Sequence, residues 1–406
     1  MKRGSKMKIT GIICEYNPFH NGHLYHIRET RNNGATHIVA VMSGNFVQRG
    51  DTAIMDKIDR ARLAVRSGAD LVIELPVQYC LSSAESFARG AVYLLDSLGP
   101  VQELSFGSEC GDVEKLRKAL DTVEKTAREH EEEIRQIMEK GYTYPRALSS
   151  VIKGSDPEIA DIISSPNNLL AIEYMRALRE FSSEMEPFTI KRMYTPHDGA
   201  DTVNGFASAS FIREQLLADN NADEIGEYTT SIWRDAVNEA VRNGNIASLS
   251  RLERIMLYKL RSTTAEEIAR ISDVGQGLEN RIYGARMAGS LDELLFTVKT
   301  KRYTMARIRR IMLALLIGIT KEDMKQLPPY GRILSFNERG REILSQAKNK
   351  TKIPYASSIA KLSQLNDTAE RFAELEIRAS DLYGLALETV TSAQKDYRAK
   401  IMIDME

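Results

Sequence analysis

Residues 11–23 have the sequence Gly-Ile-Ile-Cys-Glu-Tyr-Asn-Pro-Phe-His-Asn-Gly-His, and this stretch decides the predicted fold. An apolar run ends in a turn that carries His20 and His23, and a segment of helical character follows. A strand that leads through a glycine-containing turn into a helix N-terminus binds anions well, because backbone N–H groups point at the ligand. Two imidazoles at that point predict a site for a nucleoside triphosphate.

Strands and helices alternate at short intervals through the first half of the chain. The predicted strands span residues 8–14, 36–42, 70–75, 103–106 and 188–193. Helical segments lie between them at 22–33, 56–67 and 83–98, a pattern typical of βαβ units and a parallel, Rossmann-like sheet. Ligands bind at the carboxyl ends of such strands, and three polar turns follow those ends, at 20–23, 43–45 and 107–109.

The strand pattern fades beyond about residue 219. The polar, acidic segment 220–229 is expected to be a linker, and the segments after it have helical periods, at 247–261, 264–271 and 304–317. We predict an α/β domain over residues 7–219 and a mainly α-helical region over 220–406. Within the first domain, residues 112–140 form a long charged helical stretch that is expected to project into solvent.

Composition limits the function classes. The chain has 406 residues and a net charge of -1, and its three cysteines, Cys14, Cys80 and Cys110, are far apart. That spacing argues against a zinc site and a disulfide framework. Residues 1–7 lack the apolar core of a signal peptide, and the longest apolar run, 311–319, is too short to span a bilayer. We expect a cytoplasmic protein with no membrane contact.

The H-x-G-H turn and a second motif carry the predicted chemistry. Imidazoles at positions 20 and 23 can both donate to phosphate oxygens and stabilise charge that develops during nucleotidyl transfer. About two hundred residues later, Ser208-Ala-Ser210-Phe-Ile-Arg213 presents a serine-rich helix start with an arginine one turn in, a second anion site. The structural alternatives are a histidine that caps a turn and a serine N-cap, Ser208 or Ser210, with a solvated arginine.

The two motifs together resemble the HIGH-type nucleotidyltransferase superfamily, whose members move nucleotidyl groups from nucleoside triphosphates. Longer strings are similar to a narrower family, the bacterial tRNA(Met) cytidine acetate ligases. These strings are EYNPFHNGHLYH, MSGNFVQRG, DLVIELP, FARGAVYLL, SFGSE and SPNN in the first half, and TKRYTMARIRRIMLALLIG and YGRILSFNERGREIL in the second. The resemblance therefore covers most of the chain.

This resemblance implies an ATP-dependent acetate ligase. Acetate would attack the α-phosphate of ATP to give acetyl-adenylate and pyrophosphate, and the acetyl group would pass to N4 of the wobble cytidine in elongator tRNA(Met). His20, His23 and Arg213 would be the catalytic residues. The ATP-binding positions implied by the family, with Ser210 added, are Ile13, Cys14, Glu15, Tyr16, Asn17, Pro18, Phe19, His20, Asn21, Gly22, His23, Leu24, Tyr25, His26, Gly107, Asn167 or Asn168, Arg192 and Ser210.

Two further groups of residues are candidates for the other substrates. Arg49 and Lys57 could hold a phosphate or the acetate carboxylate, or could be solvated surface charges. Residues 299–352 hold 14 basic and four acidic residues, an excess of ten positive charges in a nearly neutral chain. Such a block, with Tyr303 and Tyr330, suits an RNA backbone with unstacked bases, although charge runs are commonly solvated helix faces. The residues predicted to bind tRNA are Lys301, Arg302, Arg307, Arg309 and Arg310.

The competing hypothesis is a nucleotidyltransferase that adenylylates or cytidylylates a small metabolite in cofactor synthesis. It shares the histidine turn and Arg213 but does not need a basic helical half. A relict nucleotide fold that only binds RNA is disfavoured by the intact His20, His23 and Arg213. Magnesium normally accompanies a triphosphate, but the sequence shows no carboxylate cluster dedicated to it, and it indicates no protein partner.

Overall fold

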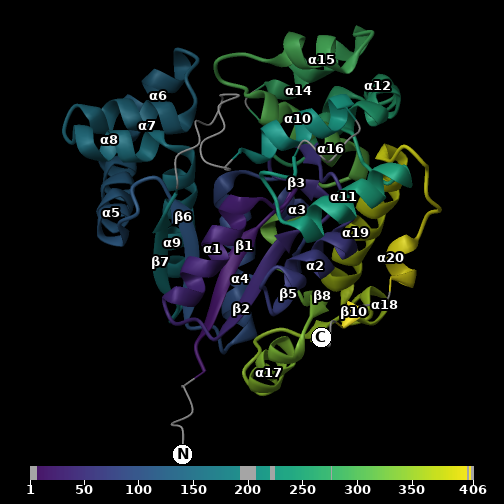
Figure 1. Cartoon of the computed structure of the whole chain (residues 1–406). Helices are drawn as coiled ribbons and strands as arrows, with labels where there is room; N and C mark the ends of the chain where they lie inside the picture. The colour runs from purple at the N-terminus through teal and green to yellow at the C-terminus, as the bar shows by residue number, and fades with distance from the viewer. Residues whose placement is uncertain (1–6, 193–206, 220–224, 276, 400–401, 404–406) are drawn as a thin grey trace, which may run out of the picture.

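The computed structural model describes residues 7–192, 207–219, 225–275, 277–399 and 402–403. Its centre is an eight-stranded sheet with the order β10-β8-β5-β2-β1-β6-β7, in which β9 pairs with β8 (Figure 1). Five strands from the first half of the chain run parallel to one another in this sheet: β1 (Ile9–Cys14), β2 (His37–Ser43), β5 (Leu71–Leu75), β6 (Glu103–Ser108) and β7 (Glu186–Lys191). The predicted parallel, Rossmann-like α/β fold is confirmed.

The second half of the chain returns to this sheet. Strand β8 (Gly331–Phe336) pairs antiparallel with β5, and β9 (Tyr355–Ala356) and β10 (Met402–Ile403) run parallel to β8. The second half is mainly α-helical, as predicted, but its strands were not. The domain boundary at 219/220 stays a prediction.

Strand β2 shows why the sheet strands have continuous apolar sequences. Successive side chains point to opposite faces, and both faces are covered by helices. Val39 and Val41 join one hydrophobic core, whereas Ile38, Ala40 and Met42 join the other. The first core contains residues of α4 (Ala84–Leu98), α9 (Pro166–Glu180) and α17 (Glu338–Ala347). The second contains residues of α1 (Asn21–Asn32), α2 (Lys57–Arg66), α10 (Ala209–Asp219) and α11 (Ser231–Arg242).

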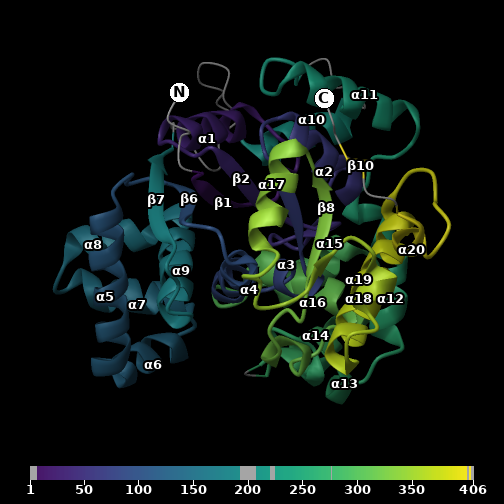
Figure 2. The ribbon, with the colours of Figure 1, turned by 90° about the horizontal axis from the view of Figure 1, so that it is seen from below.

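The charged stretch 112–140, expected to be helical and to project into solvent, is helical but partly buried. It forms two helices, α5 (Val113–Glu129) and α6 (Glu131–Glu139), which pack with α7 (Tyr144–Lys153) and α8 (Pro157–Ser164). Its apolar positions, including Leu116, Leu120 and Ile134, are buried in the first core. Both ribbon views show this helical lobe at one side of the molecule, away from α14 and α16 (Figures 1 and 2).

Most remaining helices surround a third hydrophobic core, which also contains Phe46, Val77 and Leu81 from the first half. A short two-stranded hairpin, β3 (Phe46–Val47) and β4 (Asp51–Thr52), extends from the end of β2 toward these helices. No described helix has the length and apolarity that crossing a membrane requires. The other helices are α3 (Val77–Cys80), α12 (Glu253–Arg261), α13 (Ala265–Arg270), α14 (Leu278–Gly284), α15 (Leu291–Val298), α16 (Met305–Ile317), α18 (Ile359–Leu362), α19 (Asp367–Ala386), α20 (Lys395–Arg398) and the 3₁₀ turns η1 (Leu249–Leu252), η2 (Ala285–Met287) and η3 (Asp323–Lys325).

Candidate active site

The two histidines of the H-x-G-H turn cap the first helix. His20 is the N-cap of α1, and its Nδ1 accepts a hydrogen bond from the Gly22 N–H at 3.1 Å. His23 Nδ1 accepts from the His20 N–H at 3.2 Å, which completes a capping box. The rings stack with centroids 3.8 Å apart. A Cβ at position 22 would lie 2.9 Å from the His20 ring, so this close approach requires glycine.

These caps fix the proton positions on both rings. A neutral imidazole whose Nδ1 accepts a hydrogen bond carries its proton on Nε2. Burial, with the nearby Arg192 charge, lowers the pKa of His20 to about 3. Burial and the neighbouring His20 hold the pKa of His23 well below its ordinary value. Both side chains are therefore neutral near pH 7, and each has an Nε2–H that can donate to a phosphate oxygen.

A third histidine, His26, is oriented by two buried hydroxyls. Thr30 Oγ1 donates to the His26 carbonyl at 2.8 Å and contacts Ser105 Oγ at 2.8 Å, and Ser105 Oγ lies 2.9 Å from His26 Nε2. Because each hydroxyl has one proton, Ser105 donates to Thr30 and His26 Nε2 donates to Ser105. Burial lowers the pKa of His26 to about 4, so Nδ1 remains an unprotonated acceptor.

A cavity of about 470 Å³, which we call the site cavity, brings most of the predicted residues together. His20, His23 and His26 line it at the start of α1. Its wall also contains Phe106, Gly107, Asn167, Tyr174 and Arg192, together with Glu15, Gln48, Arg49, Ser210 and Arg213. The remaining predicted residues on its wall are Ile13, Cys14, Tyr16, Asn17, Gly22 and Tyr25. Pro18, Phe19, Asn21, Leu24 and Asn168 are not part of the wall, and for every residue of the set the assignment to ATP stays a prediction.

The structure separates the two asparagines that the sequence left as alternatives. Asn168 is 3% exposed, and its Oδ1 accepts from the backbone N–H groups of Glu109 and Cys110 at 2.9 and 3.1 Å. Its Nδ2 donates to the Ile162 carbonyl. Asn168 therefore holds the loop after β6, whereas Asn167 lies on the cavity wall, where its Nδ2 donates to Glu109 Oε1 at 2.7 Å.

Gly107 permits Arg192 to lie against the end of β6. The Arg192 N–H donates to the Ser108 carbonyl at 2.9 Å, and a Cβ at position 107 would lie 3.2 Å from Arg192 Cγ. The family resemblance implied that Gly107 binds ATP, and the structure places the Arg192 side chain against this glycine.

Gly107→Ala should therefore raise the dissociation constant for ATP about tenfold, equivalent to about 1.4 kcal/mol, because the new methyl group displaces Arg192. Calorimetric titration with ATP measures this effect. Gly284→Ala is the control, since its Cβ would occupy open space in α14. Unchanged ATP affinity in Gly107→Ala would show that the position of Arg192 does not matter for binding.

The second motif also lines the site cavity. Ser208 caps α10, because its Oγ accepts from the Phe211 N–H at 3.1 Å. Arg213 donates to the Asn17 carbonyl at 2.8 Å and to Ser210 Oγ at 3.2 Å, so α10 is joined directly to the histidine turn. Arg49 also donates to Ser210 Oγ, at 3.4 Å.

Lys57 does not belong to the site. It is 1% exposed, and its Nζ contacts carboxylates of Glu74, Glu376 and Asp396 at 2.5, 3.4 and 2.8 Å. Both suggestions for Lys57, an anion ligand and a solvated surface charge, are wrong, because a buried lysine bound by carboxylates can reach neither ligand nor solvent. Arg49, in contrast, is exposed and lines the site cavity.

The hairpin that carries Arg49 is held by the helical half. Arg310 donates to the Gln48 carbonyl at 3.2 Å and forms an ion pair with Asp273 at 2.8 Å. A Cβ on Gly50, where φ is +71°, would lie 2.6 Å from the backbone nitrogen of Arg310. The hairpin turn therefore lies directly against α16.

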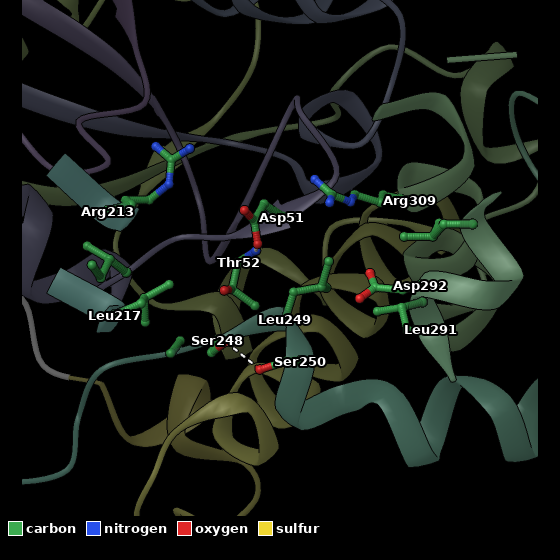
Figure 3. A pocket seen from close by; sticks show the side chains of 13 residues that line it. Asp51, Thr52, Arg213, Leu217, Ser248, Leu249, Ser250, Leu291, Asp292 and Arg309 are labelled. Atoms are coloured by element: carbon green, nitrogen blue, oxygen red, sulfur yellow. Dashed lines mark hydrogen bonds between the residues drawn. The ribbon is translucent and has the colours of Figure 1, made fainter. Parts of the chain in front are cut away.

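A second cavity of about 190 Å³ lies between the two halves and shares Arg213 with the site cavity (Figure 3). Arg309 lines it, and Asp51 lies between Arg213 and Arg309 in this view. The wall on the helical side includes Ser248, Ser250 and Asp292, with leucines among them. A predicted catalytic residue and a predicted tRNA-binding residue thus meet at one cavity.

The other basic residues predicted to bind tRNA differ in their surroundings. Lys301 is exposed, whereas Arg302 and Arg307 lie over the ring of Tyr303, at 5.9 and 5.5 Å from its centroid. Arg307 also pairs with Asp273 at 3.2 Å, and Arg310 is 11% exposed. Pairing with an aspartate outside the basic block reduces the charge that Arg307 and Arg310 can offer to RNA.

Sequence reasoning missed the support that residues 225–233 give to the histidine turn. Two residues of the segment expected to be a linker bind the turn. Thr229 Oγ1 donates to the Phe19 carbonyl at 2.7 Å, and the Tyr228 carbonyl accepts from the Asn21 N–H at 2.8 Å. Trp233, which is fully buried, stacks on Phe19 with centroids 5.4 Å apart. The one local feature of the sequence that could have indicated this support is the single tryptophan, Trp233, directly after a polar stretch. Residues 220–224 of the predicted linker and Met193 of the last predicted strand lie outside the described residues.

Comparison with known proteins gives consistent results. The family model described as HIGH Nucleotidyl Transferase matches residues 7–398. A tRNA(Met) cytidine acetate ligase from Caldanaerobacter subterraneus subsp. tengcongensis is 39% identical over 399 residues, covering 96% of this chain and 98% of that protein. The ligase of the same name from Thermoanaerobacter sp. (strain X514) is 38% identical over 400 residues, with the same coverage. The crystal structure of Thermotoga maritima TmcAL bound with alpha-thio ATP is 30% identical, with a TM-score of 0.90, and covers 98% of this chain and 100% of that chain.

Proposed function

The chain belongs to the HIGH nucleotidyl transferase family and, within it, to the tRNA(Met) cytidine acetate ligases; on that premise we propose how its residues share the two steps of the reaction. The enzyme forms acetyl-adenylate and pyrophosphate from acetate and ATP. It then transfers the acetyl group to N4 of the wobble cytidine of tRNA(Met), which we take to be the elongator tRNA. The observation that carries this proposal is the meeting of two Nε2–H donors and Arg213 in one cavity.

In the first step, an acetate oxygen forms a bond to the α-phosphorus of ATP while the bond from that phosphorus to the bridging oxygen breaks. Negative charge increases on the departing pyrophosphate. His20 and His23 donate from Nε2 to phosphate oxygens, and because both rings are fixed by backbone N–H groups, the donors need no reorganisation. A neutral imidazole can fill this role, because its Nε2–H donates a hydrogen bond while Nδ1 accepts one from the backbone.

Arg213 supplies the positive charge at this end of the cavity. Its guanidinium is held by the Asn17 carbonyl and Ser210 Oγ, so its direction is set before the substrate arrives. Burial lowers the pKa of Arg213, but an arginine remains charged at neutral pH. We assign Arg213 and the exposed Arg49 to anionic oxygens of the triphosphate and of acetate.

The nucleoside of ATP then occupies the other end of the site cavity. Asn167 offers an amide, Arg192 offers a guanidinium, and Phe106 and Tyr174 offer aromatic surface. Magnesium ions would enter with the triphosphate as part of the substrate. The described residues contain no group of three or more His, Cys, Asp and Glu side chains arranged to hold a metal ion. We place the reaction in the cytoplasm, together with its tRNA substrate.

Acetate-dependent exchange of labelled pyrophosphate into ATP, measured without tRNA, tests the first step. Exchange that requires acetate is expected, because the site cavity holds the adenylation residues in the absence of RNA. The competing hypothesis, adenylylation or cytidylylation of a small metabolite, would give no exchange with acetate. Exchange would then depend on the other acceptor.

The predicted tRNA surface is tested at the exposed Lys301 and the adjacent Arg302. Lys301→Ala combined with Arg302→Ala should weaken tRNA binding. The plot of log affinity against log salt should become shallower by about 1.5, the loss of roughly two phosphate contacts. Filter binding at several salt concentrations gives this slope. Lys153→Ala, at an exposed lysine of α7, is the control. An unchanged slope in the double variant would remove these residues from the RNA surface, while Arg309 would stay a candidate.

A further inference from the structure

Glu15 is the one acidic side chain among the described residues that line the site cavity. The other ionisable groups on that wall include Lys191, Arg49, Arg192 and Arg213, together with the three neutral histidines. ATP and acetate are both anionic, so a carboxylate beside them costs free energy through like-charge repulsion. A hydrogen-bond donor next to the Glu15 carboxylate would offset this repulsion. Neither the acetate carboxylate nor the α-phosphate of ATP carries such a donor.

The carboxylate of Glu15 is held by one oxygen only. Its Oε1 accepts from the Gln48 N–H at 2.7 Å and from Ser43 Oγ at 3.5 Å. Among the described residues, no hydrogen bond or ion pair reaches Oε2. Gln48 is in turn fixed through its carbonyl by Arg310, which pairs with Asp273. The Gln48 backbone therefore connects Glu15 to the helical half of the protein, the half predicted to bind tRNA.

We propose that Glu15 Oε2 accepts a hydrogen bond from the N4 amine of the target cytidine and takes a proton from that amine during acetyl transfer. This inference rests on the proposed function and names a catalytic residue for its second step. Cytosine presents an N4 amine donor, for which glutamate and aspartate are the matching acceptors, whereas uracil presents an acceptor at O4. The same contact therefore selects cytidine over uridine.

The atoms of this step balance without any further reactant. The N4 nitrogen forms a bond to the carbonyl carbon of acetyl-adenylate, and the bond from that carbon to the phosphate oxygen breaks, releasing AMP. The amine loses one proton, which Glu15 accepts and later returns to solvent. A carboxylate can do this only while it is ionised.

The surroundings of Glu15 act on its pKa in opposite directions. Burial raises its pKa above the ordinary value, while the Gln48 N–H and the arginines around it oppose that rise. Because the base is the ionised form, the rate of acetyl transfer should rise with pH through the pKa of Glu15 and then level off. The charged or titratable groups that face it are Arg49 from the hairpin, Arg60 from α2, Arg213 from α10, Cys14 from β1, Cys80 from α3 and Tyr174 from α9.

Glu15→Gln tests the inference, because an amide oxygen keeps the hydrogen bond from the Gln48 N–H but cannot take the proton. Two rates are measured with ATP, acetate and tRNA(Met): acetate-dependent pyrophosphate exchange, and single-turnover acetyl transfer from preformed enzyme-bound acetyl-adenylate. The rate of acetyl transfer should fall by roughly 10²–10⁴-fold, the usual contribution of a general base. The factor by which the rate of pyrophosphate exchange falls should be smaller by at least about tenfold. The rise of the transfer rate with pH should also disappear in the variant.

Two further variants complete the experiment. Glu29→Gln, on α1 and away from the site cavity, should leave both rates unchanged. Glu15→Asp keeps a carboxylate, and its rate of acetyl transfer should be at least about tenfold higher than that of Glu15→Gln. Equal loss of exchange and transfer in Glu15→Gln, or no recovery in Glu15→Asp, would overturn the assignment. Failure of the proposed function would look different, since the unaltered enzyme would then show no acetate-dependent exchange.

Discussion

His23→Ala is expected to lower acetate-dependent pyrophosphate release by roughly 10³-fold and to leave the affinity for tRNA nearly unchanged. The substitution removes an Nε2–H that is fixed in direction by the His20 N–H. It also removes half of the capping box of α1, which should cost about 1 kcal/mol of folding stability. That stability loss is far too small to explain the expected loss of rate. Pyrophosphate exchange and tRNA binding are measured on the same preparation.

His130→Ala is the matched control for this prediction. His130 is an exposed histidine between α5 and α6 that pairs with Glu133, and it lies outside the site cavity. Its loss should change neither exchange nor tRNA binding. If His23→Ala lost both in equal measure, the turn would have a structural role, and the assignment of the imidazoles to phosphate would be wrong.

Lys57→Met is expected to destabilise the fold by about 3–5 kcal/mol, because it leaves buried carboxylates without their partner. Lys57 on α2 contacts Glu74 on β5, Glu376 on α19 and Asp396 on α20, and Arg332 on β8 pairs with Glu74 and Asp396. All five side chains are at most 4% exposed. The cluster joins the nucleotide-binding sheet to the last two helices of the chain.

Burial and neighbouring charges shift the pKa values of this cluster. Burial and the adjacent Glu74 hold the pKa of Glu376 well above its ordinary value. Burial opposes the charge of Lys57, but Asp396 and Glu74 outweigh it and raise the pKa of the lysine. Lys57 and Arg332 are the two cations that face these buried acidic groups, and removal of Lys57 leaves Arg332 alone against them.

Chemical denaturation at pH 7 measures the free energy of unfolding for this variant. Lys140→Met, at an exposed lysine after α6, should stay within about 0.5 kcal/mol of the unaltered protein. A loss below about 1 kcal/mol in Lys57→Met would mean that the cluster rearranges or takes up water around the missing charge. The buried carboxylates would then not depend on Lys57 as their partner.

Local sequence patterns predicted the first half of the fold because its strands are buried on both faces. Such strands have continuous apolar sequences, and the helices between them have clear periods, so β1, β2, β5 and β6 were expected close to their observed positions. The H-x-G-H turn could also be placed at a strand end and helix start. What it would bind beyond a phosphate came from the family resemblance.

Long-range contacts decided the features that sequence patterns did not show. Lys57 occupies an amphipathic helix and resembles a surface charge locally, yet its partners lie 17, 319 and 339 residues away in the chain. The strands from the second half pair with β5 and with each other, which no local period indicates. Counting charges in the basic block also ignored Asp273, which lies outside the block and pairs with two of its arginines.

The choice between Asn167 and Asn168 needed side-chain geometry for a similar reason. Both residues stand at the start of α9, and helix periodicity turns them to different sides. One faces the site cavity and the other binds the backbone behind it. Adjacent identical residues cannot be told apart by composition or spacing.

The most direct measurement is nucleoside analysis of tRNA(Met) after incubation with this protein, ATP and labelled acetate. The proposed function predicts labelled N4-acetylcytidine at the wobble position, formed only when ATP and acetate are both present. Absence of N4-acetylcytidine, together with nucleotidyl transfer to another acceptor that does not depend on acetate, would contradict it.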